Sequence, residues 1–200
     1  RSVMIFRWVC ATLIVLLATI VPPSVASSLA TLRFGTACAK CHEGECSGRL
    51  SFARRPETAY EHIRQYAGPT DDELARLLYD ALEQMKADCS YGALPAPDLS
   101  QPLNADDLAP YLDAWSGAYF LPLSTLAPGR YQLTIGFIGS GRVRIEVIDG
   151  EFDPFIDQCI AVEIRHLEVD ITLTANQPHY LRLQPRGPIR VDQLRLTRQQ

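Results

Sequence analysis

The segment from Cys38 to Cys46 contains three cysteines and one histidine in nine residues, although the 200-residue chain has only six cysteines and four histidines. Cysteine and histidine are the usual ligands of transition metals and of haem iron. Such crowding is rarely a packing device. It indicates a bound metal or cofactor.

The order Cys38-Ala39-Lys40-Cys41-His42 has the spacing of a haem-attachment motif. Two cysteines add across the two vinyl groups of the porphyrin, and the adjacent histidine returns on the same helical turn to bind the iron. A thioredoxin-type redox pair is one alternative, but that pair follows a strand in a βαβ unit. Half of a zinc site is another, with Cys46 and Cys89 as the candidates for its remaining ligands. We therefore expect one covalent haem c, held by Cys38, Cys41 and His42.

Helices are expected to position this motif from Thr31 to about Tyr91. A strong start signal lies at Pro69-Thr70-Asp71-Asp72-Glu73, where we predict Thr70 as the N-cap and Glu73 as its capping-box partner. The apolar residues that follow repeat every three or four positions, which is typical of one buried helix face. They are Leu74, Leu77, Leu78, Ala81, Leu82 and Met85.

Residues 31–91 resemble the small class I cytochromes c, through FGTACAKCH near the start and PTDDELARLLYDALEQMK near the end. The resemblance implies covalent haem through Cys38 and Cys41, His42 as the proximal ligand, and a first helix that crosses the last. In that family a methionine before the last helix usually fills the sixth coordination position. This chain has no methionine there.

Two residues are candidates for the sixth ligand. His62 shares a helical face with Ala59, Ile63 and Tyr66 and lies eight residues before Thr70. Met85 is the alternative, although methionine also fills gaps in apolar cores and Met85 completes the leucine stripe. A second histidine would give a lower reduction potential than a methionine.

The first residues predict export. Arg1 and Arg7 precede a short apolar run, which Pro22-Pro23 and small residues follow, so residues 1–26 are expected to be a cleaved secretory signal. The alternative is a retained anchor, but the run is shorter than the ~20 residues of a membrane-spanning helix. We expect a periplasmic or extracellular, oxidising location, membrane-bound only if the segment is retained.

In an oxidising compartment thiols tend to pair. Cys46 and Cys89 flank the two ends of the helical part, and we predict a disulfide between them that supports a small domain of residues 27–93. Cys159 is left over, either as a buried residue or as an intermolecular link.

The second half of the chain changes character. Residues 94–114 are rich in Pro, Asp and Ala and are predicted to be a linker. Within residues 115–200, short segments alternate polar and apolar residues, which is typical of half-buried strands and predicts an antiparallel β-sandwich. The expected strands lie at Tyr131–Phe137, Arg142–Ile148, Val169–Thr174, Tyr180–Leu183 and Ile189–Leu196.

This pattern is similar to that of the galactose-binding-like jelly rolls, which include many carbohydrate-binding modules. Its arginines are expected to lie on a solvated face or on a docking surface, and its aromatic residues in the core or at a domain interface. His166 and His179 are interpreted as ordinary surface or strand residues. The aromatic residues in question are Trp115, Tyr119, Phe120, Phe152, Phe155 and Tyr180.

The predicted fold class is α+β, with a small all-α haem domain followed by a jelly-roll-like sandwich. The expected function is single-electron transfer by an exported monohaem protein, with no catalytic residues, in contact with redox partner proteins. The alternative is a haem-containing binding or sensor protein whose sandwich recognises carbohydrate or a surface partner. The net charge of −4 argues against a nucleic-acid partner.

Overall fold

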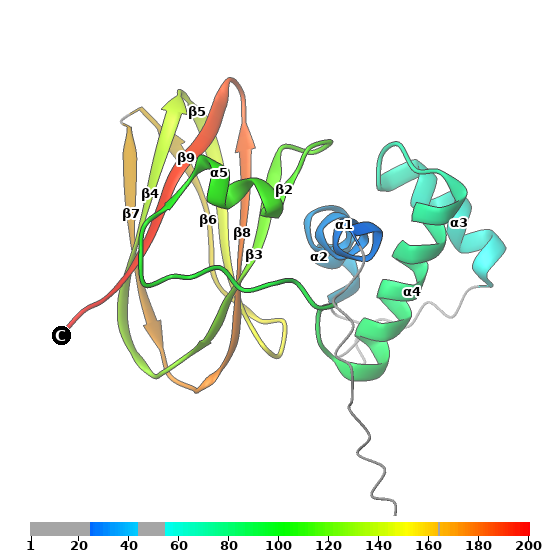
Figure 1. The fold of residues 1–200 in the computed structure, drawn as a ribbon, viewed down its shortest axis with the longest axis horizontal. Helices are drawn as coiled ribbons and strands as arrows, with labels where there is room; N and C mark the ends of the chain where they lie inside the picture. The colour runs from blue at the N-terminus through cyan, green and yellow to red at the C-terminus, as the bar shows by residue number, and fades with distance from the viewer. Residues whose placement is uncertain (1–24, 44–54, 164) are drawn as a thin grey trace, which may run out of the picture.

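The structure is a computed structural model, and it describes residues 25–43, 55–163 and 165–200. A group of helices lies against one side of a two-layer β-sandwich (Figure 1). In the described part of the chain, no helix is both long and apolar enough to cross a membrane. Residues 1–24 lie outside the described ranges, so the signal segment stays a prediction.

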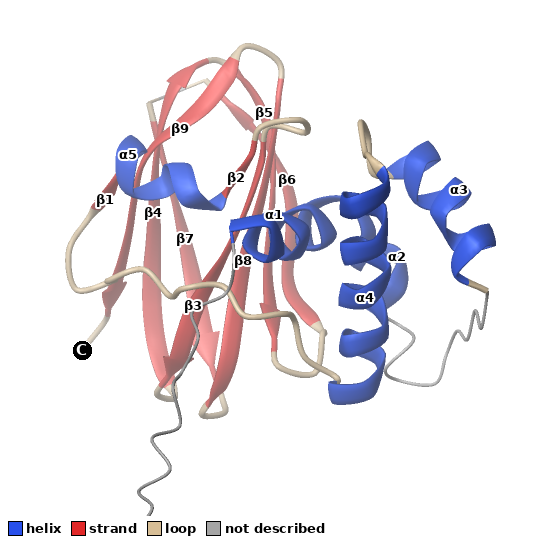
Figure 2. Cartoon of the chain, turned by 45° about the vertical axis from the view of Figure 1, so that its right-hand side comes forward, coloured by secondary structure: helices blue, strands red, loops and turns tan. Residues whose placement is uncertain are grey.

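The helical part is built from two packed segments. The first is a continuous run in which a π-helical turn joins two α-helices: α1 (Val25–Arg33), η1 (Phe34–Cys38) and α2 (Ala39–His42). The second is a helical pair, α3 (Pro56–Tyr66) and α4 (Asp72–Asp88), whose members contact each other. α1 lies between the sandwich and α4 (Figure 2), and Figure 1 shows α2 in the same position. The attachment motif therefore has the sandwich on one side and α3 and α4 on the other.

The predicted start of α4 is off by one residue. Asp71, not Thr70, is the N-cap, because its side chain accepts a hydrogen bond from the Leu74 backbone N–H at 2.8 Å. The Thr70 hydroxyl is buried and has no hydrogen-bond partner among the described residues. Since an aspartate caps a helix at least as well as a threonine, the helix begins at Asp72.

The sandwich consists of two antiparallel sheets. One has the strand order β1-β9-β4-β7 and the other β2-β3-β8-β5-β6. All five predicted strands are confirmed, within β4, β5, β7, β8 and β9. The main strands are β3 (Ala118–Leu126), β4 (Gly129–Gly139), β5 (Gly141–Asp149), β6 (Pro154–Val162), β7 (His166–Leu173), β8 (Gln177–Arg186) and β9 (Ile189–Arg198).

Two long strands were missed by the sequence analysis. β3 begins with four buried residues in succession, so it shows no alternation, and Pro122 interrupts its apolar run. β6 lies at the edge of its sheet and is mostly exposed, so it lacks an apolar stripe. Both strands lack the periodicity on which the strand predictions rested.

The predicted linker, residues 94–114, is structured in its second half. It contains β1 (Leu103–Asn104), α5 (Ala105–Leu108), η3 (Ala109–Tyr111) and β2 (Leu112–Asp113). Asn104 and Asp107 form a capping box at α5, which explains the local density of Asn and Asp. Leu103, Leu108 and Tyr111 are buried in the sandwich core. This segment is thus part of the sandwich.

The helices do not form a separate all-α domain. Their apolar core includes Leu78 and Met85 but also Phe120 and Phe152, which come from the sandwich. The ring of Tyr91, at 6% exposure, makes edge contacts with Phe120, Phe152 and Tyr180 at centroid distances of 4.6–4.8 Å. The prediction that such aromatics lie in the core or at a domain interface is confirmed for these three. Trp115 is partly exposed but also lies at the interface, since the Arg33 guanidinium of α1 is 5.2 Å from the centroid of its ring, whereas Phe155 is exposed.

Candidate cofactor site

A cavity of about 740 Å³ lies within the helical part. That volume is within the range of about 300–1,000 Å³ typical of cofactor sites. The walls come from α3, from α4 and from residues 34–43, which span η1, α2 and Glu43 and are called the attachment segment below. They include Phe34, Cys38, Cys41, His42, Ala59, His62, Ile63, Tyr66, Leu78, Tyr79 and Leu82. Most of these side chains are apolar or aromatic, and the polar part of the lining comes from the predicted cysteines and histidines and from Thr58, Glu61 and Gln65 of α3.

Both cysteines of the motif are free thiols at the cavity wall. Burial raises the pKa of Cys38 to about 12, so its thiol is protonated at neutral pH. A thiol–disulfide catalyst requires a cysteine with a lowered pKa. The segment also follows a helix and not a strand. Both observations disfavour the thioredoxin-type alternative.

The two histidines predicted as axial ligands both line the cavity, with His42 partly buried and His62 exposed. The ring centroids of His42 and His62 are 6.2 Å apart, and the ring planes stand at 87°. A histidine nitrogen binds a metal at about 2 Å, so two imidazoles on opposite sides of one iron would have centroids roughly 6 Å apart. The separation therefore fits one haem iron between the two rings. These residues lie on α2 and α3, twenty positions apart in the sequence.

Two neighbours define the position of His62. Tyr66, one helical turn later, places its ring 4.7 Å from the imidazole. The next residue, Ile63, is buried in the helical core and anchors that face of α3. His62, Ile63 and Tyr66 all line the cavity, but only Ile63 is buried, so the expected apolar face around His62 is exposed at His62 and Tyr66.

Met85 is not brought to the cavity. It is fully buried in the helical core beside Leu78, and it is not among the residues that line the cavity. This placement fits the interpretation of Met85 as a core residue in the stripe of α4. The structure therefore favours His62 over Met85 as the residue opposite His42.

The expectation of a metal-binding chain needs a correction. In the ranges 25–43, 55–163 and 165–200, no group of three or more His, Cys, Asp or Glu side chains could hold a metal ion. A metal site made of three or more such side chains is thus absent from these ranges, while the zinc alternative also relied on Cys46, which lies outside them. A haem places a smaller demand on the protein, because the porphyrin supplies four of the iron ligands and two histidines suffice.

The remaining cysteines behave differently from one another. Cys89 is disulfide-bonded, while its predicted partner Cys46 lies outside the described residues, so the pairing itself stays a prediction. Cys159 is a free and exposed residue on the edge strand β6, so the expectation that it is buried is wrong. β6 has a neighbouring strand on one side only, so few residues are available to bury its side chains.

The sequence analysis missed two buried arginines that join the helices to the sandwich. The Arg33 side chain donates to Asp113 of β2 at 2.8 Å and to the Ala67 carbonyl at 2.7 Å. Arg182, expected on a solvated or docking face, is 1% exposed and reaches from β8 to the attachment segment. Strand alternation placed Arg182 outside the sandwich core correctly, but it could not show that helices cover that outer face.

A second, polar cavity of about 530 Å³ lies on the sandwich, at the bulge where Gly136 and Phe137 of β4 change register with β9. Its walls carry a cation, a carboxylate, an amide and an imidazole from Arg165, Asp192, Gln193 and His166. His166 is an exposed strand residue, as predicted. His179, in contrast, is buried, and its Nδ1 has no hydrogen-bond partner among the described residues.

Comparisons with known proteins match no family model and no curated protein. Among solved structures, a family 35 carbohydrate binding module from an environmental isolate matches at 20% identity and a TM-score of 0.31, over 41% of this chain and 66% of its own. The CBM35-containing GH26 β-(1,4)-mannanase of Podospora anserina matches at 16% identity and a TM-score of 0.32, over 44% and 20%. A family GH115 4-O-methyl-α-glucuronidase with specificity for decorated arabinogalactans matches at 12% identity and a TM-score of 0.37, over 72% and 25%.

This chain therefore spans less than two thirds of each of these neighbours. Two of the three contain family 35 carbohydrate binding modules, the general type of domain expected for the β-part. At these TM-scores the likeness carries no argument, and the sandwich rests on its own strand pairing. None of the comparisons supports the resemblance of residues 31–91 to the cytochromes c, so that family assignment is not retained.

Proposed function

We propose that the chain is an exported haem protein, with one haem joined to Cys38 and Cys41 and bound by His42 and His62, and that it carries single electrons. The observation that carries the proposal is a pair of imidazoles whose ring centroids are 6.2 Å apart and which line the same cavity as two free cysteines. The function does not depend on membership of a cytochrome family. It depends on these four side chains.

The residues of the chain would each have a definite task. The Cys38 and Cys41 thiols would hold the group in place, and His42 and His62 would each supply a ring nitrogen to it. Leu78, which is buried, and Tyr79, which is partly buried, would exclude water from one side of the site. Haem, when bound, supplies a one-electron couple whose potential is set by its axial ligands and its burial.

If both His42 and His62 bind the iron, they would leave no coordination position open. Binding of a gas or activation of a substrate requires such a position, whereas electron transfer does not. The geometry thus supports a carrier over a haem enzyme or a gas sensor.

Expression in a host that attaches haem tests the proposal. The wild-type chain should gain the mass of one haem and show a six-coordinate, low-spin spectrum that carbon monoxide does not change. His62→Ala should give a spectrum that responds to carbon monoxide, while the control Met85→Leu should leave the spectrum unchanged. A chain that gains no mass, or a His62→Ala variant with an unchanged spectrum, would overturn the proposal.

A second candidate function rests on the polar cavity of the sandwich. Arg165, Asp192 and Gln193 present donors and acceptors of the kind that hydroxyl-rich ligands require. We propose that this cavity gives the haem protein a carbohydrate-binding surface. Affinity electrophoresis in soluble polysaccharides tests it: Asp192→Ala should abolish a retardation that the wild type and the control Arg142→Ala both show. No retardation of the wild type in any polysaccharide would rule the candidate out.

A further inference from the structure

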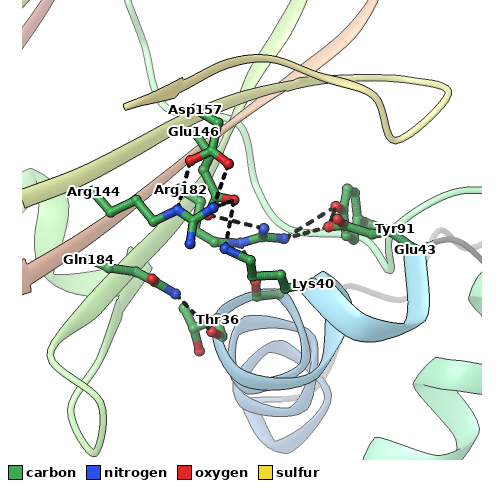
Figure 3. Close-up of polar contacts among 10 residues, drawn as sticks. Thr36, Lys40, Glu43, Tyr91, Arg144, Glu146, Asp157, Arg182 and Gln184 are labelled. Carbon is green, nitrogen blue, oxygen red and sulfur yellow. Dashed lines mark hydrogen bonds and ion pairs between the residues drawn. The ribbon is translucent and has the colours of Figure 1, made fainter. Parts of the chain in front are cut away.

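One side chain of the sandwich, that of Arg182, contacts the attachment segment near both of its ends (Figure 3). The Arg182 Nε donates to the Gly35 carbonyl at 2.7 Å, three residues before Cys38. The same guanidinium forms an ion pair with Glu43, directly after His42, at 2.5 Å. A planar guanidinium can serve two acceptors at once in fixed directions.

The charge of Arg182 is satisfied inside the protein by two carboxylates, Glu43 and Glu146. Arg182 is 1% exposed, and burial of an unpaired cation is strongly unfavourable. Its remaining nitrogen lies 3.4 Å from Glu146 of β5, which Lys40 and Arg144 also approach at 3.5 Å. The network balances three cations against three carboxylates. Its charged members are Lys40, Arg144 and Arg182 and Glu43, Glu146 and Asp157.

The carboxylate of Glu43 is held from a second side. The Tyr91 hydroxyl donates to it, and burial raises the pKa of Tyr91, so this phenol remains a donor at neutral pH. Glu43 therefore has two partners that come from outside its own helix. The end of α2 is fixed in place by both.

Close packing reinforces the grip. Gly35 lies so near the ring of Phe120 that a Cβ there would come within 2.4 Å of it. The Arg182 guanidinium itself lies 5.6 Å from the centroid of the same ring. The segment can therefore approach β3 and β8 closely only because position 35 is a glycine.

We infer that Arg182 is a positioning residue for the cofactor site: the sandwich, through this one guanidinium, fixes the segment that carries Cys38, Cys41 and His42. The sandwich is then a structural half of the site and not an independently moving module. The inference rests on the proposed function only for the identity of the bound group. The grip on residues 35–43 is a property of the chain with or without haem.

Hydrogen exchange on the full haem-free chain tests the grip directly. Arg182→Met should speed amide exchange in residues 35–43 by at least tenfold, while β4 and β9 keep their wild-type rates. Arg186→Met, at an exposed position on the same strand, is the matched control and should change neither. Equal exchange of residues 35–43 in the two variants would overturn the inference.

A second variant covers the case in which Arg182→Met does not fold. Glu43→Gln removes the ion pair from the helix side and leaves the Gly35 contact intact. It should loosen the end of α2 but not η1, whereas a general loss of stability would speed exchange in both. Uniform acceleration in both elements would therefore contradict the positioning role.

The haem-loaded protein gives an independent readout. In Arg182→Met the Glu43 carboxylate would remain beside His42 without its cation, which favours the more positive ferric state and lowers the reduction potential. Arg182→Lys keeps the positive charge and should restore most of the reduction potential. It should restore less of the protection from amide exchange, because a lysine ammonium lacks the planar set of donors with which a guanidinium binds two acceptors at once. If no haem attaches, the proposed function fails while the exchange experiment still decides the role of Arg182.

Discussion

The two parts of the molecule achieve stability in different ways. The sandwich has a continuous apolar core between its sheets, formed by residues such as Leu133, Ile145 and Leu183 that are completely buried. The helical part surrounds a cavity of about 740 Å³ and draws Phe120 and Phe152 from the sandwich into its own small core. The comparison indicates that the helices depend on the sandwich for part of their core and, under the proposed function, on a bound group as well.

Removal of both attachment cysteines should have the largest effect on this comparison. Cys38→Ala/Cys41→Ala should lose all covalent haem, because no other free cysteine lines the described cavity wall. Circular dichroism should then show a lower unfolding temperature for the helices than in the loaded wild type, while the unfolding temperature of the sandwich should not change. The mass of the chain checks the attachment. Retention of covalent haem in this variant would contradict the assignment of the site.

Phenylalanine truncations should separate the two cores. Phe120→Ala should destabilise the helical part by about 3–5 kcal/mol, since a large buried ring is lost. Phe137→Ala should cost a similar amount in the sandwich core and is the matched control. Denaturant unfolding with separate helix and strand signals measures both. If Phe120→Ala weakened only the strands, Phe120 would belong to the sandwich core alone.

Alkaline pH should weaken the helical part selectively in the haem-free chain. The pKa of Cys38 rises from 9.0 in the unfolded chain to about 12 in the fold, so the unfolded state loses its proton first as the pH rises. The contribution of the protonated Cys38 thiol to the free energy of unfolding is therefore fully present below pH 9. It declines toward pH 12, by up to about 4 kcal/mol at 1.36 kcal/mol per pKa unit. Denaturation curves at several pH values measure the decline. Cys38→Ala should remove this contribution, and a decline of the same size in that variant would refute the cause.

Acid pH should weaken the sandwich selectively, with the smallest effect of the four. Burial lowers the pKa of His179 below its ordinary 6.5, so the unfolded state gains a proton first as the pH falls. The stability that the neutral imidazole contributes is present above pH 6.5 and is lost below it. His179→Gln should flatten the pH dependence of strand unfolding between pH 6.5 and 5, whereas His166→Gln, at an exposed position, should not. Equal flattening by both variants would argue against His179 as the origin.

The sequence predicted the helices, five strands and the attachment residues because each has a local signature. Motif spacing identified Cys38 and His42, and a shared helical face pointed to His62. Arg182 had no such signature, because its role depends on which helices cover the outer face of β8. β3 was not predicted for a related reason. Its first four residues are all buried, so polar and apolar residues do not alternate there. The contacts between the two parts are long-range, and no local pattern encodes them.

Electron paramagnetic resonance of the ferric, haem-loaded protein tests the central claim most directly. With His42 and His62 as axial ligands and their ring planes at 87°, the two iron orbitals that interact with the imidazoles are nearly equal in energy. We predict a low-spin signal of the strongly anisotropic kind, with one large g-value, and its loss in His62→Ala. A high-spin signal in the wild type, or a low-spin signal that persists in His62→Ala, would contradict the account.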